Sequence, residues 1–413
     1  MMYDTETKQE TVILVAVCLG DENETDRSLD ELEELARTAG AHALARIVQN
    51  REGIHPGTYI GKGKLEELKL LLDAYAADGI ICDDELSPAQ LTNLSQTLAC
   101  KVMDRTLLIL DIFAGRARTS EGKIQVELAQ LKYRQSRLTG LGTSLSRLGG
   151  GIGTRGPGEK KLEMDRRLIA KRIRALKEEL EEVRRHRDLI RQGRKKNHHT
   201  VAAIVGYTNA GKSTLLNTLT GAGVLEEDAL FATLDPTTRM LELPEGGQIL
   251  LTDTVGFIRK LPHHLIEAFK STLEEAVFAD LIIHVVDASN PQMEQQMQVV
   301  YDTLRQLKAG DKRIITLFNK QDRLTGEVHL KDLQADHSLK ISARTGDGLP
   351  ELKMLLEELL KAQQIYIERI YPYDEAGKIA VIRSGGQLLT EEYLPEGIRI
   401  TAYLPPELYG QVE

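Results

Sequence analysis

One eight-residue segment of the chain has the spacing of a phosphate-binding loop. Residues 206–213 read Gly-Tyr-Thr-Asn-Ala-Gly-Lys-Ser, which matches G-x-x-x-x-G-K-[ST], and they lie between an apolar strand and a helix. In such a loop backbone N–H groups surround the phosphates, the lysine neutralises β- and γ-phosphate oxygens, and the serine hydroxyl coordinates Mg²⁺. We assign a catalytic role to Lys212. The residues expected to bind the nucleotide here are Gly206, Tyr207, Thr208, Asn209, Ala210, Gly211, Lys212, Ser213 and Thr214.

A D-x-x-G motif follows the strand predicted at residues 248–252. Its aspartate is expected to reach the Mg²⁺ shell together with Ser213, and its glycine N–H is placed to sense a γ-phosphate. We therefore assign a second catalytic role to Gly256. The nucleotide-site residues of this motif are Asp253, Thr254, Val255 and Gly256.

Two later motifs specify the base. Residues 319–322 match N-K-x-D, in which the aspartate accepts hydrogen bonds from guanine N1 and the exocyclic N2 amine. Adenine lacks that pair of donors, so the motif selects GTP over ATP. Residues 342–344 supply an S-A-x element, which places a backbone N–H near guanine O6. The base-site residues are Asn319, Lys320, Gln321, Asp322, Ser342, Ala343 and Arg344.

A switch segment between the phosphate loop and Asp253 must supply a hydroxyl that completes the Mg²⁺ shell while the γ-phosphate is present. The candidates are Thr233, Thr237 and Thr238, and residue types alone do not separate them.

The position directly after the D-x-x-G glycine is Phe257. Many GTPases have a water-orienting glutamine there, and phenylalanine has no hydrogen-bonding group. Another group, from the switches or from a bound partner, must therefore position the attacking water.

Alternating strands and helices position these motifs. Apolar runs predict strands at residues 201–205, 248–252, 281–286, 313–318 and 339–341, and helices at 212–219, 264–277, 293–307 and 349–361. This order is typical of a doubly wound nucleotide-binding domain. The N-terminal part also alternates, with a strand at 12–19 and a helix expected to begin at Ser28, where Glu31 completes a capping-box pattern.

The segment 115–199 is strongly basic. It has 23 basic and 10 acidic residues, a net charge of +13, so the rest of this −9 chain carries −22. A basic insert in an acidic protein suggests an anionic partner, most often nucleic acid, although a solvated pair of charged helices would have the same composition.

A seven-residue apolar repeat predicts that this basic segment is a helical hairpin. The glycine-rich stretch 139–158 between the arms cannot pack a core, and its cations favour a tip that contacts RNA. One arm carries Ile169, Ile173, Leu176, Leu180, Val183 and Ile190, and the other carries Ile124, Leu128, Leu131 and Leu138. The candidate RNA contacts are Arg147, Arg155, Lys160 and Lys161.

These patterns predict a multi-domain α/β protein. The expected domains are an N-terminal α/β domain at 1–114, a basic helical hairpin with a glycine-rich loop at 115–199, a GTP-binding domain with a doubly wound sheet at 200–364, and a small strand-rich domain at 365–413. The sequence does not indicate a role for the last one.

Nearly the whole chain resembles the HflX family of bacterial GTPases, which is related to the Obg branch of translation-associated GTPases. The resemblance rests on Gly-Thr-Arg-Gly-Pro-Gly-Glu at 153–159, Phe-Ala-Thr-Leu-Asp at 231–235, Asp-Thr-Val-Gly-Phe-Ile-Arg at 253–259 and the two nucleotide motifs at 206–213 and 319–322. It implies that Thr233 is the switch ligand of Mg²⁺, and that Phe231, Ala232, Thr233, Leu234 and Asp235 belong to the nucleotide site. It also implies the large ribosomal subunit and its rRNA as partner, and a role at stalled or stressed ribosomes that includes subunit separation.

Composition limits the alternatives. The longest apolar runs are far shorter than a membrane span, and the first ten residues lack the pattern of a signal peptide, so we expect a cytoplasmic protein. Three widely spaced cysteines give no zinc or disulfide pattern, and a monomer is the simplest expectation. One alternative is an RNA-remodelling motor with an ATP-using N-terminal domain, although residues 1–120 contain no second phosphate loop. Another is a GTPase that regulates a protein or a membrane, against which the lack of Trp and the six Phe count.

Overall fold

The chain divides into two compact units in the computed structural model, which describes residues 9–145, 157–196, 200–221, 230–262, 265, 270–324, 326 and 330–413. The first unit contains the described residues of Met1–Val183, Glu227–Asp235 and Arg259–Lys270, and the second contains those of Arg184–Glu226, Pro236–Ile258 and Ser271–Glu413. Two short pieces of the predicted nucleotide-binding domain, before Pro236 and after Ile258, therefore belong to the first unit.

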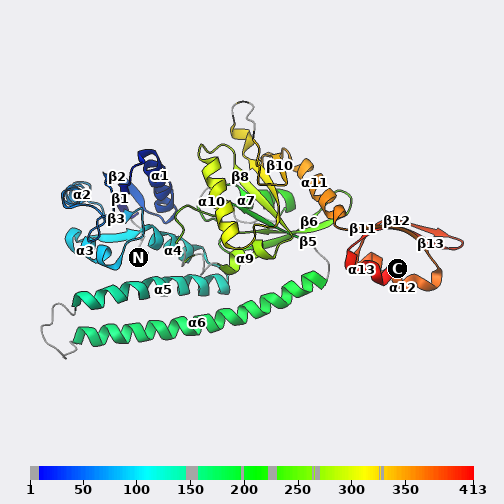
Figure 1. Ribbon diagram of the computed structural model, residues 1–413, viewed down its shortest axis with the longest axis horizontal. Helices are drawn as coiled ribbons and strands as arrows, with labels where there is room; N and C mark the ends of the chain where they lie inside the picture. Colours follow the sequence, from blue (N-terminus) through cyan, green and yellow to red (C-terminus); the bar gives the residue numbers. More distant parts are fainter. Residues whose placement is uncertain are drawn as a thin grey trace, which may run out of the picture. The chain divides into compact units, whose positions relative to one another are not determined.

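A four-stranded parallel sheet forms the centre of the first unit, with strand order β2-β1-β3-β4 (Figure 1). Residues 12–18 of β1 are all buried, as expected for a central parallel strand with helices on both faces. The elements are β1 (Thr11–Cys18), α1 (Glu22–Thr38), β2 (His42–Asn50), α2 (Lys62–Tyr75), β3 (Gly79–Cys82), α3 (Pro88–Leu98), β4 (Lys101–Asp104) and α4 (Arg105–Arg116).

The first helix begins earlier than the sequence pattern predicted. Its N-cap is Asp21, whose carboxylate accepts the backbone N–H of Glu24 at 3.0 Å, so the expectation of a start at Ser28 was wrong. Two candidate caps precede the same apolar face, and a helix that begins at the earlier one adds two turns of backbone hydrogen bonds. Ser28 is instead buried within α1, where its hydroxyl donates to Asp83 at 2.7 Å.

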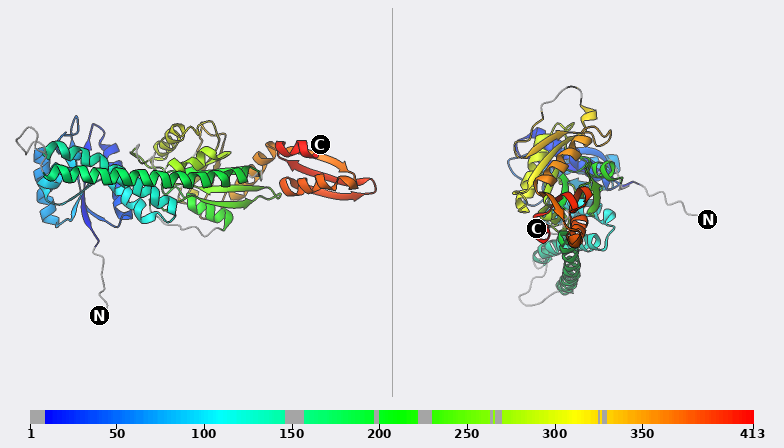
Figure 2. Two further views of the ribbon diagram at one scale, coloured as in Figure 1. Left: turned by 90° about the horizontal axis from the view of Figure 1, so that it is seen from below. Right: turned by 90° about the vertical axis from the view of Figure 1, so that its right-hand side faces the viewer.

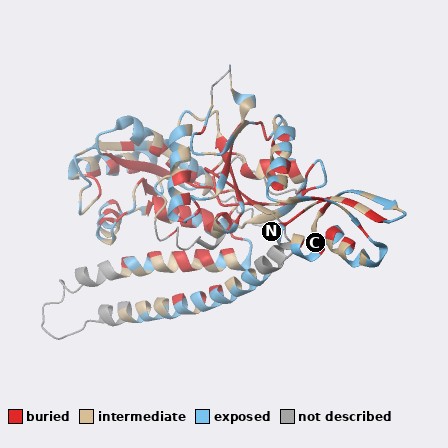
Figure 3. Cartoon of the chain, turned by 45° about the vertical axis from the view of Figure 1, so that its right-hand side comes forward, coloured by how far each residue is buried: buried red, intermediate tan, exposed pale blue. Residues whose placement is uncertain are grey.

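The predicted helical hairpin is confirmed by α5 (Ser120–Leu145) and α6 (Pro157–Lys196), which lie side by side (Figures 1 and 2). Leu128 on α5 packs with Ile173, Leu176 and Leu180 on α6, as the apolar repeat predicted. Arg172 binds the Glu127 carboxylate through two nitrogens at 2.7 and 2.8 Å, which adds a bidentate pair between the arms. Buried residues recur along α5 in Figure 3.

Polar contacts also fix α5 to the four-stranded sheet. The Arg137 guanidinium, nearly buried, donates to Asp104 at 2.7 Å and to the Leu86 carbonyl at 3.1 Å, while the Tyr133 hydroxyl donates to the other Asp104 oxygen at 2.8 Å. Asp104 is fully buried and caps α4 through the Leu107 N–H. A buried charge with this many partners favours a single geometry, so these contacts orient the first hairpin arm against the sheet.

The second unit contains the predicted doubly wound sheet, with strand order β10-β9-β8-β5-β7-β6 (Figure 1). All neighbours are parallel except β6 and β7. Its strands are β5 (Thr200–Gly206), β6 (Thr237–Glu242), β7 (Gln248–Asp253), β8 (Leu281–Asp287), β9 (Arg313–Asn319) and β10 (His337–Lys340), and its helices include α7 (Lys212–Thr220), α9 (Lys270–Phe278), α10 (Met293–Gln306) and α11 (Leu349–Ala362).

The C-terminal region is a small antiparallel sheet, as expected from its short apolar runs. Its strands β11 (Ile365–Tyr371), β12 (Gln387–Leu394) and β13 (Gly397–Leu404) have the order β11-β13-β12, and α12 (Ala376–Gly385) and α13 (Pro406–Val412) pack with them around Ile382 and Ile400. None of the helices in the described part of the chain has the length and apolarity needed to cross a lipid bilayer.

Candidate nucleotide-binding site

The carboxyl end of β5 leads directly into the phosphate loop, and α7 begins within it at Lys212. Two glycines are required here by close packing. A side chain at Gly206 would collide with the Val285 carbonyl, and one at Gly211, where φ is +95°, would collide with the Asn319 amide. The loop therefore approaches β8 and β9 more closely than a side chain would permit.

Lys212 is the buried cation of this loop. Its side chain is 6% exposed and its Nζ donates to the Tyr207 carbonyl at 2.8 Å, within the loop itself. Burial lowers the pKa of the ammonium to about 8, the nearby Lys320 charge acts in the same direction, and Asp253 opposes both. An anion at this point would relieve the desolvation and the repulsion together.

Gly256 lies against the same amine. A Cβ built there would be 3.0 Å from Lys212 Nζ and 2.8 Å from Thr208 Cγ2, so only glycine fits without displacement of the loop. The D-x-x-G backbone thus reaches the part of the loop where a terminal phosphate would meet the lysine.

Ser213 and Asp253 are brought together from the two neighbouring parallel strands β5 and β7. The Ser213 hydroxyl donates to Asp253 Oδ2 at 2.8 Å, and Asp253 is fully buried at the end of its strand. Thr254 donates its hydroxyl to the Ile204 carbonyl at 2.8 Å, which fixes the motif against β5.

Asn319 joins three of the sequence motifs. Its amide nitrogen donates to the Ala210 carbonyl of the phosphate loop at 2.8 Å, and its oxygen accepts the Ala343 N–H at 2.9 Å. The next residue, Lys320, donates to the Asn209 carbonyl at 2.8 Å and pairs with Asp287 at 2.8 Å.

The residues expected to specify the base lie near the carboxyl ends of β9 and β10. The exposed Asp322 accepts the Ser342 hydroxyl at 2.7 Å, while Ser342 is itself buried and donates its N–H to the Asp347 carbonyl. Gln321 turns back to the Phe318 carbonyl, and the Arg344 side chain is exposed. Asp322 therefore has its second oxygen available in an orientation fixed by a buried neighbour.

Phe257 is bound to the phosphate loop through its backbone. Its N–H donates to the Gly206 carbonyl at 3.0 Å, its carbonyl accepts the Thr208 N–H at 2.8 Å, and its ring is 1% exposed. The side chain is a packed core residue with no means of orienting water.

The three threonines considered for the switch differ in surroundings. Thr237 and Thr238 lie in β6, opposite Asp253 and Thr252 of β7, and the hydroxyls of Thr238 and Thr252 are hydrogen bonded at 2.9 Å. Thr233 lies outside any strand, is half-buried, and belongs to the first unit with Phe231–Asp235.

Of the candidate RNA contacts, Arg147 and Arg155 lie outside the described residues. Lys160 and Lys161 lie in the first turns of α6, where the backbone alone is described.

Two kinds of functional residue escaped the sequence analysis. Asp287, which holds Lys320, ends an apolar strand just as Asp253 does, and that shared position is the signal that could have identified it. Arg259 and Lys260 follow the D-x-x-G motif as two adjacent cations, a pattern too common to single out.

A phosphate loop after β5, a D-x-x-G motif after β7 and an N-K-x-D motif after β9, all at one edge of a doubly wound sheet, define a P-loop GTPase. Family models match residues 26–114 ("GTP-binding GTPase N-terminal"), 116–194 ("GTP-binding GTPase Middle Region") and 201–320 ("50S ribosome-binding GTPase"). A GTPase HflX from Lacrimispora saccharolytica is 67% identical over 98% of this chain and 96% of its own length. One from Caldanaerobacter subterraneus subsp. tengcongensis is 50% identical over 98% of this chain and 94% of its own length.

The chain belongs to the HflX family of GTPases, and it is a GTP hydrolase. Among solved structures, a GTP-binding protein from the archaeon Sulfolobus solfataricus in complex with GDP is 25% identical, with a TM-score of 0.45 over 85% of this chain and 98% of that one.

Proposed function

We propose that this protein is a Mg²⁺-dependent GTPase switch that binds the large ribosomal subunit through its basic hairpin, and that GTP binding and hydrolysis control this association. Separation or rescue of ribosomes under stress is the role that this activity would serve. The observation that carries the proposal is the combination of a complete guanine-nucleotide motif set with a +13 segment in a chain whose remainder is −22.

At the phosphate end, residues 206–214 surround the phosphates with backbone N–H groups, and the Lys212 ammonium neutralises the β and γ oxygens. Two features support this assignment: the cation is buried with a depressed pKa, and the loop contains glycines that admit no side chain. The charge developing in phosphoryl transfer would be stabilised by Lys212 and by the Gly256 N–H.

The residues at Ser213 and Asp253 fit a magnesium ion. GTPase domains of this kind generally use Mg²⁺, a hard cation that takes oxygen ligands and is usually bound through one or two carboxylates together with phosphate oxygens and water. A serine hydroxyl and a buried carboxylate 2.8 Å apart at the end of the phosphate loop provide such a set. Thr233, the switch ligand that the family resemblance implies, would supply the third protein ligand. When bound, the ion would offset charge between the β- and γ-phosphates.

At the base end, Asp322 reads guanine N1 and N2, the backbone of residues 342–344 faces O6, and Asn319 holds both elements to the phosphate loop. The hydrogen bonds from Ser342 to Asp322 and from Ala343 to Asn319 support this placement, because they fix the reading groups before a base arrives.

The hairpin is the proposed surface for rRNA. In the described part of α6 the exposed cations include Lys171, Arg174 and Lys177, and the candidate tip residues extend the basic segment. Phosphate contacts by lysine and arginine supply most of the affinity in such interfaces. The matched family description for residues 201–320 points to the same partner.

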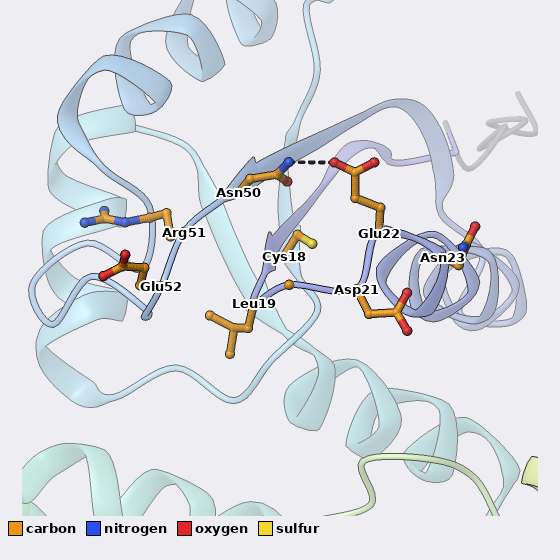
Figure 4. A pocket seen from close by; sticks show the side chains of 9 residues that line it. Cys18, Leu19, Asp21, Glu22, Asn23, Asn50, Arg51 and Glu52 are labelled. Carbon is orange, nitrogen blue, oxygen red and sulfur yellow. Dashed lines mark hydrogen bonds between the residues drawn. The ribbon is translucent and has the colours of Figure 1, made fainter.

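An ATP-using N-terminal domain finds little support in the residues available there. The first unit has an open cavity of about 760 Å³ at the carboxyl ends of β1 and β2 (Figure 4). Its rim carries the carboxylates of Asp21, Glu22 and Glu52, of which Glu22 accepts an amide N–H from Asn50 at 2.7 Å. Carboxylates at the start of α1 would repel a triphosphate, whereas phosphate sites leave helix N-termini free of them.

The remaining expectations stay proposals of the same account. They are the four domains with boundaries after residues 114, 199 and 364, a cytoplasmic location, and a monomeric state.

The hairpin assignment can be tested by changing Arg147, Arg155, Lys160 and Lys161 to Ala. Each lost phosphate contact removes nearly one unit from the log–log slope of affinity against salt, so the variant should bind large subunits more weakly and with a flatter slope. Sedimentation with purified large subunits at several salt concentrations, in a non-hydrolysable GTP analogue, measures both.

The matched control changes four exposed cations outside the hairpin, Lys62, Lys69, Lys308 and Arg313, by the same total charge. GTP binding without ribosomes should be equal in all three proteins. An unchanged affinity and slope in the tip variant would remove this loop from the interface.

A further inference from the structure

The first unit has a pair of adjacent carboxylates, Asp83 and Asp84, at the carboxyl end of β3 beside β1. These strands are parallel neighbours, and the chain reverses its direction of winding between them, which is where doubly wound sheets bind ligands. Asp83 and Asp84 follow β3 directly. Asp83 is 1% exposed, and Asp84 accepts the hydroxyl of the buried Tyr59 at 2.6 Å.

A lysine that follows the D-x-x-G motif in the sequence pairs with both of these carboxylates. Lys260 Nζ lies 2.5 Å from Asp83 Oδ2 and 2.9 Å from Asp84 Oδ1, and these three residues all belong to the first unit. The preceding residue, Arg259, pairs with Glu24 of α1 at 2.7 Å, and its carbonyl accepts a hydrogen bond from Arg105 at 3.4 Å.

A second, buried cation also contacts Asp83. Arg105, nearly fully buried, donates to Asp83 Oδ1 at 2.9 Å and pairs with Glu31, so Asp83 lies between two cations from distant parts of the sequence. Burial raises the pKa of the Asp83 carboxyl, and the Lys260 charge and the Ser28 hydroxyl oppose this effect. The Lys260 ammonium therefore offsets part of the cost of burying this carboxylate.

The Lys260 backbone is also held in an uncommon conformation. Its φ is +52°, in the left-handed region that side chains other than Gly, Asn and Asp seldom adopt. Such a conformation persists where surrounding contacts enforce it.

Three residues separate Lys260 from Gly256. The first of them, Phe257, is tied to the phosphate loop by two backbone hydrogen bonds, and Gly256 lies against the Lys212 amine. The segment from Gly256 to Lys260 is therefore held near its start by the backbone hydrogen bonds of Phe257 and at its end by the ion pairs of Lys260.

Within the first unit, the segment that contains Thr233 is held by contacts of Asp235. Asp235 accepts the N–H groups of Arg118 and Thr119 at 3.0 and 2.9 Å, and also the Thr119 hydroxyl, at the start of α5. A side chain at Gly122 would collide with the Asp235 carboxylate. The segment containing Thr233 is thus held by the first arm of the hairpin.

We propose that the ion pairs of Lys260 with Asp83 and Asp84 favour the binding of GTP over GDP at the phosphate loop. This inference rests on the nucleotide site proposed above. These ion pairs help to keep Gly256 beside Lys212, where the γ-phosphate would be bound. GTP binding then does not have to supply the entropic cost of ordering the segment. GDP has no γ-phosphate, so the ion pairs of Lys260 do not raise its affinity.

The test is the ratio of the Kd for GDP to the Kd for a non-hydrolysable GTP analogue, measured by titration calorimetry on the full chain. We expect Lys260→Ala to lower this ratio about fivefold, a typical value for coupled sites. Asp84→Asn should lower it by less, because Asp83 still pairs with the ammonium. The double variant should match Lys260→Ala, because that substitution already removes both ion pairs. Asp84→Asn keeps an oxygen to accept the Tyr59 hydroxyl.

The matched control is Lys101→Ala, which removes an exposed lysine from an ion pair with Glu10 on the same unit. Its ratio should equal that of the unchanged protein. A ratio that stays constant in Lys260→Ala and Asp84→Asn, or shifts toward GTP, would overturn the inference even if both variants are less stable. Failure of the unchanged protein to bind either nucleotide would overturn the nucleotide site as well, which separates the two claims.

Discussion

Saturating large ribosomal subunits should accelerate GTP hydrolysis by this protein by about 10³–10⁵-fold. The reason is Phe257, which is buried and hydrogen bonded through its backbone alone at the position where many GTPases place a water-orienting glutamine. The isolated protein has the cation and backbone donors that stabilise charge, but the nucleophile is poorly positioned. It should therefore bind GTP well and hydrolyse it slowly until a partner completes the site.

Single-turnover hydrolysis with and without large subunits measures this effect. Lys212→Ala provides the control, because loss of the phosphate-facing ammonium should abolish hydrolysis under both conditions and so exclude contaminating GTPases. A fast rate for the protein alone would mean that a switch residue already positions the water. Demonstrated binding of subunits without acceleration would make the ribosome a target and not the activator.

Changing Asp322 to Asn should move the preference from GTP to xanthosine triphosphate. The carboxylate accepts two guanine N–H donors, whereas an amide can donate to the xanthine oxygen that the carboxylate would repel. Loss of hydrogen bonds to a charged group costs about 3 kcal/mol, or roughly 100-fold in GTP affinity. Titration of both nucleotides against the variant measures the change.

Asp347→Asn is the matched control, since it removes an exposed charge in the loop whose backbone accepts the Ser342 N–H. It should retain guanine preference. If the Asp322 variant still strongly preferred GTP, the base-reading residue would lie elsewhere.

The parts of this site that the sequence predicted are those encoded by short contiguous motifs. The phosphate loop, D-x-x-G and N-K-x-D each occupy a few residues at the end of an apolar strand, and parallel strands bring such ends to one edge. The hairpin was predicted for a similar reason, because its apolar repeat is local and places Leu128 against Ile173 and Leu176.

The parts that escaped prediction depend on contacts between residues far apart in the chain. Lys260 and Asp83 are 177 positions apart, and neither has a local pattern that indicates the other. The start of α1 was misplaced because Asp21 and Ser28 both precede the same apolar face. The hydrogen bond between Thr238 and Thr252 likewise depends on the pairing of β6 with β7, which the residue types of the three candidate threonines do not reveal.

The central claim is that the bound nucleotide controls association with the large ribosomal subunit. Its most direct test is the Kd of the full chain for purified large subunits at one fixed salt concentration, measured with a non-hydrolysable GTP analogue and with GDP. We expect the Kd for large subunits to be at least about tenfold lower with the GTP analogue than with GDP, which is within the usual range of coupling between two sites. Equal affinity in the two nucleotides, or no binding in either, would contradict it.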